Sequence, residues 1–276
     1  MEVIYIAGAS HSGSTLLAMM LNAHSEIVSV GELLKLNMKL QGAAPCSCGA
    51  PSFGQCEFWR RVNEHARSKV NKTLKELNVL DYARLDEDSA PNAIVLRAIS
   101  EVSAKKFVVD ASKKPDRLSY LLKLPGLDVH PIVLIRDPKG QVCSVKKKHG
   151  GFLGPILRYE YVYEQLRHLL ERVPHSFVIY EDLVAHPEHV LRRILKPLGL
   201  DFEPQQLSWG QEANHFVGGN RLRRLRPTNS ELVLDERWKR DLTRIQRTVI
   251  DLLTVRSRQF RESYRNSPSS SFVAND

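Results

Sequence analysis

The sequence predicts an α/β fold, in which a parallel β-sheet is flanked by helices on both faces. Short apolar runs at residues 3–6, 107–109, 132–135 and 177–180 are bounded by turn residues and followed by segments of helical length. A strand that is covered on both faces gives a continuous apolar run of this kind. The runs therefore predict strands of one buried parallel sheet, connected by helices.

The segments that follow these runs carry helical patterns. Residues 14–23 are apolar nearly all round, which suits a helix buried against the sheet. Residues 63–77 and 158–173 place apolar side chains at i, i+3 and i+4 among charged ones, as amphipathic surface helices do. A long polar helix is predicted at about residues 234–260, and the Ser-rich stretch 266–276 predicts a frayed tail.

Length and composition favour one domain spanning residues 1–265. The 276 residues are 42% hydrophobic and 26% charged, so the chain can bury a core without disulfide or metal staples. No apolar window has the length of a membrane span, and no basic segment precedes the first apolar run, which predicts a cytoplasmic protein. The net charge of +9 predicts an anionic partner without identifying it.

A phosphate-binding loop is predicted directly after the first strand. Gly8 and Gly13 are separated by four residues and are followed by Ser14 and Thr15, so the spacing matches G-x-x-x-x-G-K-S/T with serine replacing lysine. Such glycines let backbone N–H groups surround a phosphate at the amino end of a helix. The missing lysine argues against an ATPase, because that side chain neutralises the phosphates of a nucleoside triphosphate. An ordinary Gly- and Ser-rich turn is the alternative.

Two further groups complement this loop. His11 stands at its tip, where a protonated imidazole would stabilise charge on a leaving phosphate oxygen. Arg136 ends the third apolar run and Ser144 follows eight residues later, so a guanidinium fork and a hydroxyl are available for a second phosphate. The alternatives are an exposed loop histidine and an arginine that pairs with Asp137.

Five segments, in the same order along the chain, resemble bacterial sulfotransferases that use 3′-phosphoadenosine 5′-phosphosulfate (PAPS). The loop is similar to the lysine-less P-loop of that family, and Arg136 with Ser144 is similar to its 3′-phosphate site. Residues 110–115, 180–183 and 215–223 match the family segments D-x-S-K-x-P, Y-E-D-L and H-x-x-x-G-N-x-x-R. The resemblance implies a P-loop-type sheet and transfer of a sulfuryl group from PAPS to a hydroxyl or amine, with no metal required.

The resemblance also implies which residues bind the donor: Ser10, His11, Ser12, Gly13, Ser14, Thr15, Arg136, Ser144, Gly219, Asn220 and Arg223. Many members of the family carry Lys or Arg where this chain has His11. A P-loop nucleotide or metabolite kinase is the alternative, in which Asp110 would be the magnesium-binding aspartate after a strand. The missing loop lysine weighs against that alternative.

The acceptor side has three candidates. In tyrosylprotein and related Golgi-type sulfotransferases a glutamate at the corresponding place is the general base, and the resemblance carries this role to Glu32. Burial beside an acceptor pocket would raise the pKa of Glu32 towards neutrality; alternatively, Glu32 complements the dipole of a helix at residues 33–40. Ser112 and Lys113 end a strand, where ligands of parallel sheets bind, although Lys113 also suits a solvated basic turn.

Cys46, Cys48 and Cys56 lie in an insertion at about residues 41–60, similar to a cysteine-rich insertion of some bacterial relatives. Three thiols within 11 residues suit zinc if a fourth ligand such as His65 joins them, or two of them suit a disulfide. The spacing departs from the usual C-x2-C pair, so no metal is predicted and we expect the insertion to shape the acceptor side.

The basic runs at residues 146–148 and 221–226 are not accompanied by an RNA-binding signature or a zinc finger. They adjoin Ser144 and contain Arg223, so we expect them to border the donor site or attract an acidic acceptor, and we expect no nucleic-acid partner. A small metabolite, a saccharide, a lipid and a protein tyrosine stay open as acceptors, as does the oligomeric state. The rival from another class is a non-catalytic polyanion-binding protein.

Overall fold

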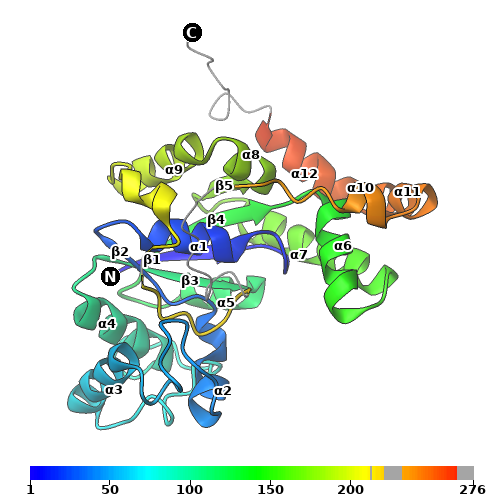
Figure 1. Cartoon of the computed structure of the whole chain (residues 1–276). Coiled ribbons are helices and arrows are strands. Elements are labelled where there is room, and N and C mark those ends of the chain that lie inside the picture. Colours follow the sequence, from blue (N-terminus) through cyan, green and yellow to red (C-terminus); the bar gives the residue numbers. More distant parts are fainter. Residues whose placement is uncertain (212, 221–231, 266–276) are drawn as a thin grey trace.

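The computed structural model describes residues 1–211, 213–220 and 232–265 and confirms the α/β fold. Five parallel strands form one sheet in the order β2-β3-β1-β4-β5 (Figure 1). The strands are β1 (Glu2–Ala7), β2 (Ile27–Ser29), β3 (Phe107–Lys113), β4 (Asp128–Ile135) and β5 (Ser176–Ile179). Four of them correspond to the predicted apolar runs, the last of which runs one residue past β5 into α8 (Tyr180–Ala185). The strand β2 was not predicted, since only two apolar residues precede its final serine.

Side chains of β1 alternate between two separate apolar cores. Val3 and Tyr5 point to one face of the sheet, Ile4 and Ile6 to the other, and all four are fully buried. A period of two with both faces buried explains why the strand reads as a continuous apolar run. Each such aliphatic side chain contributes roughly 1.5–3 kcal/mol by leaving water.

Helices cover both faces of the sheet (Figure 1). One core includes side chains from α1 (Ser14–Asn22), α8 (Tyr180–Ala185), α9 (Pro187–Leu195), η2 (Lys196–Leu198) and η3 (Pro204–Ser208). The opposite core includes side chains from α3 (Glu57–Val70), α4 (Pro91–Ser103), α5 (Pro115–Leu121) and α7 (Leu153–Leu169), together with η1 (Leu33–Lys35) and α2 (Leu36–Gln41). A third, smaller core joins α6 (Pro138–His149), α7 and the C-terminal helices.

The predicted helix at 63–77 is wrong at both ends. The observed helix α3 begins at Glu57 and ends at Val70, because Asn71 takes a left-handed conformation with φ 53° and its N–H donates to the carbonyl of Arg67. Asn tolerates this conformation better than most residues, so it ends helices much as glycine does. The apolar residues that follow pack as a loop.

The single long helix predicted at 234–260 is also wrong. The chain forms α10 (Trp238–Asp241), α11 (Arg244–Leu253) and α12 (Val255–Arg265) instead. Leu242 is extended and buried, and Thr243 then starts α11 with a capping box in which its hydroxyl accepts from the N–H of Gln246. This local cap competes with continuation of the preceding helix, although the polar pattern runs through both. The predicted tail at 266–276 lies outside the described residues.

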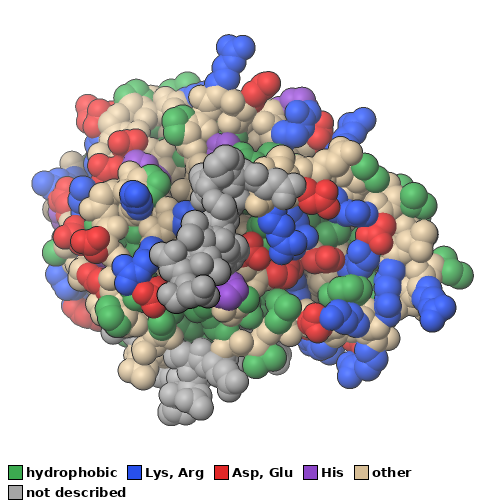
Figure 2. All heavy atoms as spheres, turned by 90° about the horizontal axis from the view of Figure 1, so that it is seen from above, with side chains coloured by type: hydrophobic (Ala, Val, Ile, Leu, Met, Phe, Trp, Pro, Cys, Tyr) green, Lys and Arg blue, Asp and Glu red, His purple; other side chains and the backbone are tan. Residues whose placement is uncertain are grey.

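Basic and acidic side chains are interspersed over the surface seen in Figure 2, and Lys and Arg gather on the side where α6, α10 and α11 lie in Figure 1. The last turn of α6 contributes Lys146, Lys147 and Lys148, as its basic sequence run requires. Within the described parts of the chain, every helix is too short or too polar to cross a bilayer.

Candidate functional site

The loop between β1 and α1 has the conformation that its glycines predict. Gly8 has φ 150°, and a Cβ there would lie 2.3 Å from the carbonyl oxygen of Leu134 on β4. Gly13 has φ 95° at the N-cap of α1, and its Cβ would lie 2.3 Å from Cδ2 of Tyr180. The loop therefore passes so close to its neighbours that side chains are excluded at both positions.

We predict that Gly13→Ala destabilises the fold more than Gly199→Ala does. Both glycines have positive φ, but no described atom lies within 4 Å of a Cβ at Gly199. The control Gly199→Ala therefore loses only the roughly 1–2 kcal/mol that an alanine costs in a left-handed backbone conformation. Gly13→Ala loses this amount and, in addition, the free energy of the collision with Tyr180. Urea denaturation of both variants measures the difference, and equal losses would contradict the close packing of the loop.

Buried side chains from α7 and α6 hold the loop in place. The Tyr163 hydroxyl donates to the carbonyl of Leu134 (2.8 Å) and accepts from the N–H of Ala9 (3.2 Å) and the hydroxyl of Ser12 (3.1 Å). Burial raises the pKa of Tyr163 to about 12, so it stays a donor. Gln141 donates to the carbonyl of Ser10 at 2.7 Å. Neither support was predicted from the sequence, because both residues stand in ordinary helical patterns.

Arg136 and Ser144, the residues predicted to bind a second phosphate, both contact His11 of the loop. Arg136 is nearly buried at the end of β4 and donates to the carbonyl of His11 (3.2 Å), while Ser144 Oγ lies 3.0 Å from His11 Nδ1. The Arg136 guanidinium stacks on the ring of Tyr180 at 4.6 Å and pairs with the Asp235 carboxylate at 3.1 Å. The ends of β1 and β4 thus bring together the two elements that the sequence predicts to bind anions.

His11 has a strained backbone with φ 68°, which is uncommon for a residue with a side chain. Burial lowers the pKa of His11 to about 4, and the positive charges of Lys148, His149 and Arg136 act in the same direction. The ring is therefore neutral near pH 7, unlike the protonated donor considered from the sequence. A bound phosphate would oppose this shift by favouring the charged form.

Glu32 forms a half-buried cluster with two lysines. Its carboxylate lies 2.8 Å from Nζ of Lys113 and 2.5 Å from Nζ of Lys35. Burial raises the pKa of Glu32, but the two ammonium groups outweigh burial and the net pKa is lowered. The expected raised pKa is therefore wrong: Glu32 is a well-ionised carboxylate. Lys113 has φ 71°, and burial lowers its pKa.

A cavity of about 280 Å³ lies between this cluster and the phosphate loop. Loop residues Gly8 to His11 line one side, Glu32 and Lys113 line another, and Val145 and Arg158 contribute from α6 and α7. Glu32 precedes η1 but makes no capping hydrogen bond with its side chain. This position favours the cavity-facing interpretation of Glu32 over the helix-dipole interpretation.

Ser112 and Asp110 are engaged within the fold. The Ser112 hydroxyl donates to the Asp110 carboxylate and accepts from the N–H of Leu34 at 3.1 Å, although Ser112 also borders the cavity. Asp110 is fully buried and pairs with Nε of Arg117 at 2.7 Å. Because the Asp110 carboxylate is already used by Arg117 and by the N–H of Leu33 in η1, it is engaged within the fold and is not free to bind a magnesium ion.

Residues 219 and 220, which the family resemblance places among the donor-binding residues, contact the start of α1. The N–H of Asn220 donates to Oγ1 of Thr15 at 2.9 Å, and Gly219 passes so close that a Cβ there would lie 2.9 Å from the same oxygen. Ser14 and Thr15 are both buried in the first turn of α1. Arg223 lies outside the described residues.

The three cysteines of the insertion meet His215 and not His65. Ligand atoms of Cys46, Cys48, Cys56 and His215 all lie within 4.8 Å of one another. His65 instead pairs with Glu101 at 2.8 Å. The sequence placed His215 only in the family-like segment 215–223. Its ring faces the thiols because residues 214–220 run beside the insertion before they reach Thr15.

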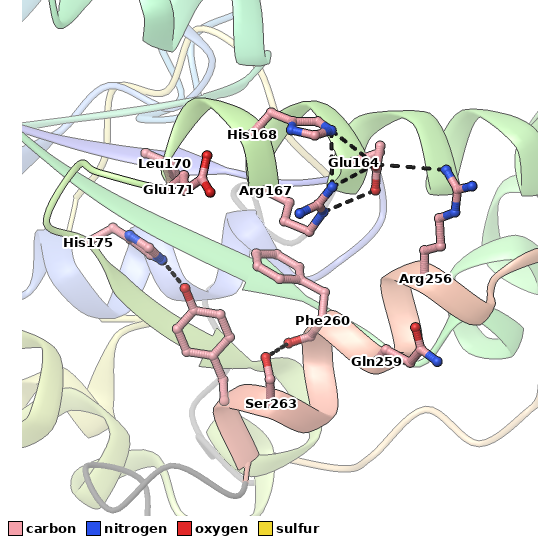
Figure 3. A pocket seen from close by; sticks show the side chains of 11 residues that line it. Glu164, Arg167, His168, Leu170, Glu171, His175, Arg256, Gln259, Phe260 and Ser263 are labelled. Carbon is pink, nitrogen blue, oxygen red and sulfur yellow. Dashed lines mark hydrogen bonds and ion pairs between the residues drawn. The ribbon is translucent and has the colours of Figure 1, made fainter.

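A larger cavity, of about 890 Å³, lies elsewhere, between α7 and α12 (Figure 3). It is an open, charged recess: Glu164 binds Arg167 at 3.0 Å and His168 at 3.1 Å, and His175 contacts the Tyr264 hydroxyl. These groups satisfy one another and none belongs to the phosphate loop. The smaller cavity at the strand ends is the better candidate site, since ligands of open parallel sheets bind there.

Comparisons with known proteins identify sulfotransferases as similar to this chain. A model described as "Sulfotransferase family" matches residues 3–204. The sulfotransferase domain of the Synechococcus PCC 7002 olefin synthase superposes with a TM-score of 0.61 at 20% identity, covering 97% of this chain and 95% of that one. The sulfotransferase domain from the curacin biosynthetic pathway gives 0.56 at 17%, covering 91% and 96%. No curated protein matches the sequence.

Proposed function

The chain belongs to the sulfotransferase family, and from this premise we propose that it transfers a sulfuryl group from PAPS to a hydroxyl or amine and leaves adenosine 3′,5′-bisphosphate. The observation that carries the proposal is the meeting of the lysine-less loop with Arg136, which donates to the His11 carbonyl at 3.2 Å. One element suits a 5′-phosphosulfate and the other a 3′-phosphate.

The donor would lie across the ends of β1 and β4. Backbone N–H groups of the loop and the hydroxyls of Ser14 and Thr15 suit the phosphosulfate at the amino end of α1. Arg136 and Ser144 suit the 3′-phosphate, and Gly219 and Asn220 approach from the opposite side through Thr15. Their proposed roles follow from this placement.

In the proposed reaction, an acceptor oxygen or nitrogen forms a bond to sulfur while the bond from sulfur to the bridging phosphate oxygen breaks. Glu32 takes the acceptor proton, and the loop donors stabilise the charge that develops on the departing phosphate. Lys113 lies 2.8 Å from Glu32, close enough to hold the carboxylate in place and to contact the sulfonate oxygens. No step uses a metal.

The acceptor would enter the cavity of about 280 Å³. Leu34, Pro115, Pro155 and Val162 give this cavity an apolar part, while Lys35 and Arg158 give it a basic part. Such a lining suits a small molecule with an apolar body and an anionic or polar end. A saccharide or lipid headgroup, which is polar throughout, would use mainly the basic part of the cavity.

Thermal denaturation tests the donor. We predict that adenosine 3′,5′-bisphosphate raises the melting temperature, whereas ATP with magnesium and a non-specific oligonucleotide do not. A ligand at 100 times its Kd contributes about 2.7 kcal/mol, a shift of several degrees for a chain of this size. Stabilisation by ATP alone would favour a kinase, and a steeply salt-dependent oligonucleotide effect would favour a polyanion-binding protein.

Arg136→Ala is expected to weaken bisphosphate binding at least tenfold, because each charge-assisted hydrogen bond contributes roughly 1.5–3 kcal/mol. Isothermal titration of the bisphosphate measures the loss, and the melting temperature without ligand reports any damage to the fold. Arg167→Ala on the exposed surface of α7 is the matched control. Unchanged binding in Arg136→Ala would contradict the proposed 3′-phosphate site.

A further inference from the structure

The cluster of Cys46, Cys48, Cys56 and His215 has the composition of a metal site. Cys46 and Cys56 are buried, and Cys48 and His215 are half-buried. All four cysteines of the described chain are unbridged, and the cluster gathers three of them around one imidazole. Three thiols and one imidazole nitrogen are a common ligand set of structural zinc.

We propose that these four residues bind one zinc ion. A tetrahedral site with Zn–S near 2.3 Å and Zn–N near 2.0–2.1 Å separates sulfurs by about 3.8 Å and sulfur from nitrogen by about 3.6 Å. Cys48 Sγ lies 3.7 Å from Cys56 Sγ, and His215 Nδ1 lies 3.2 Å from Cys56 Sγ and 4.0 Å from Cys46 Sγ. These three separations lie within about 0.4 Å of the tetrahedral values, and all the ligand atoms lie within 4.8 Å of one another.

The backbone around the thiols is folded as a tight turn. The N–H of Gly49 donates to the carbonyl of Cys46 at 3.2 Å, and the N–H of Cys46 donates to the carbonyl of Ala50 at 3.0 Å. Gly49 has φ 104°, a conformation that glycine adopts without strain. The turn brings Cys46 and Cys48 to the same side, which compensates for the short C-x-C spacing.

His215 is held in position by the same insertion. Its ring stacks on Phe58 at a centroid distance of 4.6 Å, and its carbonyl accepts from the indole N–H of Trp59 at 3.0 Å. Ser47 donates to the carbonyl of Asn214 at 2.8 Å and accepts from the N–H of Phe216 at 2.7 Å. Contacts on both sides of His215 fix the direction of Nδ1, as metal-binding histidines require.

The geometry favours a metal over a disulfide. A disulfide needs an S–S distance near 2.05 Å and leaves one thiol and the imidazole without a role, whereas a zinc ion uses all four groups. Zinc would also join the insertion to residues 214–220. In this segment the N–H of Asn220 donates to Thr15, which lies in the first turn of α1 after the phosphate loop. The metal would thus support the donor side of the proposed active site from a distance, without taking part in the reaction.

Metal analysis tests the inference without any nucleotide, so it succeeds or fails independently of the proposed function. The full-length protein, purified without chelators, is expected to contain one zinc ion per chain by mass spectrometry of the metal. Cys48→Ser and His215→Ala are expected to lose most of it. Cys143→Ser and His65→Ala are the matched controls and are expected to retain it.

A second measurement uses the wild-type protein, so it remains informative if the variants fail to fold. Wild-type protein reconstituted with Co²⁺ is expected to show thiolate-to-cobalt charge transfer and the visible bands of tetrahedral cobalt. Zinc-free wild-type protein that gives no such bands would overturn the inference, as would a Cys48–Cys56 disulfide in a non-reducing mass map. Retention of zinc by folded Cys48→Ser and His215→Ala would also overturn the proposed ligand set.

Discussion

Replacement of Glu32 by Gln is expected to reduce kcat by about 10²- to 10⁴-fold while bisphosphate affinity stays unchanged. The amide would keep the shape of the side chain and lose the proton acceptor beside the cavity. The carboxylate is held by Lys113 at 2.8 Å and Lys35 at 2.5 Å, so its position is defined before an acceptor arrives. Release of adenosine 3′,5′-bisphosphate from PAPS, measured with a panel of alcohols and amines, gives the rate.

The pH profile adds a second readout. Since the lysines lower the pKa of Glu32 despite its burial, the carboxylate is deprotonated at pH 7 and is lost only as the pH falls below the ordinary range of a glutamate. We expect the acid limb of kcat/KM to lie in that low range and to disappear in Glu32→Gln. Glu64→Gln, on an exposed face of α3, is the control. If kcat or the acid limb of the kcat/KM profile were unchanged in Glu32→Gln, a residue other than Glu32 would be the general base.

Asp110→Ala is expected to lower the free energy of unfolding by about 3–5 kcal/mol, because it leaves a buried guanidinium without its counter-ion. Asp110 and Arg117 are both 0% exposed and lie 2.7 Å apart. Asp110 also accepts from the N–H groups of Leu33 (3.3 Å) and Ser112 (3.0 Å), so the loss extends to the segment that presents Glu32.

Urea denaturation measures this effect, and Glu57→Ala provides the comparison. Glu57 pairs with Arg60 at the same distance of 2.7 Å, but its side chain is 67% exposed. Solvent screening makes such a surface pair contribute far less to stability than a buried one, so the loss in Glu57→Ala is expected to be small. Similar losses in the two variants would show that burial does not strengthen the Asp110–Arg117 pair. The double change Asp110→Leu with Arg117→Met is expected to recover part of the loss.

The conformation of the loop and its neighbours in the proposed donor site was predictable from the sequence, since its signals are local. The glycine spacing predicted a turn that places Gly13 at the N-cap of α1, and the eight-residue separation predicted that Ser144 would follow Arg136 into the same site. Parallel strands brought these two local signals together, because the carboxyl ends of neighbouring strands share one edge of the sheet.

The rest depends on contacts between residues that are far apart in the chain. Cys56 and His215 are 159 positions apart, and neither the C-x-C spacing nor the family-like motif around His215 indicates that they meet. The lowered pKa of Glu32 likewise depends on Lys113, which comes from another strand end. Burial beside an acceptor pocket predicted a raised pKa for Glu32, but the sign of the pKa shift was decided by the two lysines that the fold places nearby.

If Arg136 binds a 3′-phosphate as proposed, its pairing with Asp235 makes that binding an exchange of partners. Arg136 already donates from Nη2 to the Asp235 carbonyl at 3.1 Å and pairs with its carboxylate. A phosphate that arrives there contributes only the difference between its own interaction and that of the carboxylate. When a bisphosphate leaves, the aspartate can reoccupy the guanidinium at once, so departure does not leave a buried cation unpaired. At the proposed site, this internal competitor would limit affinity and ease product release, a step that sets the turnover of many enzymes.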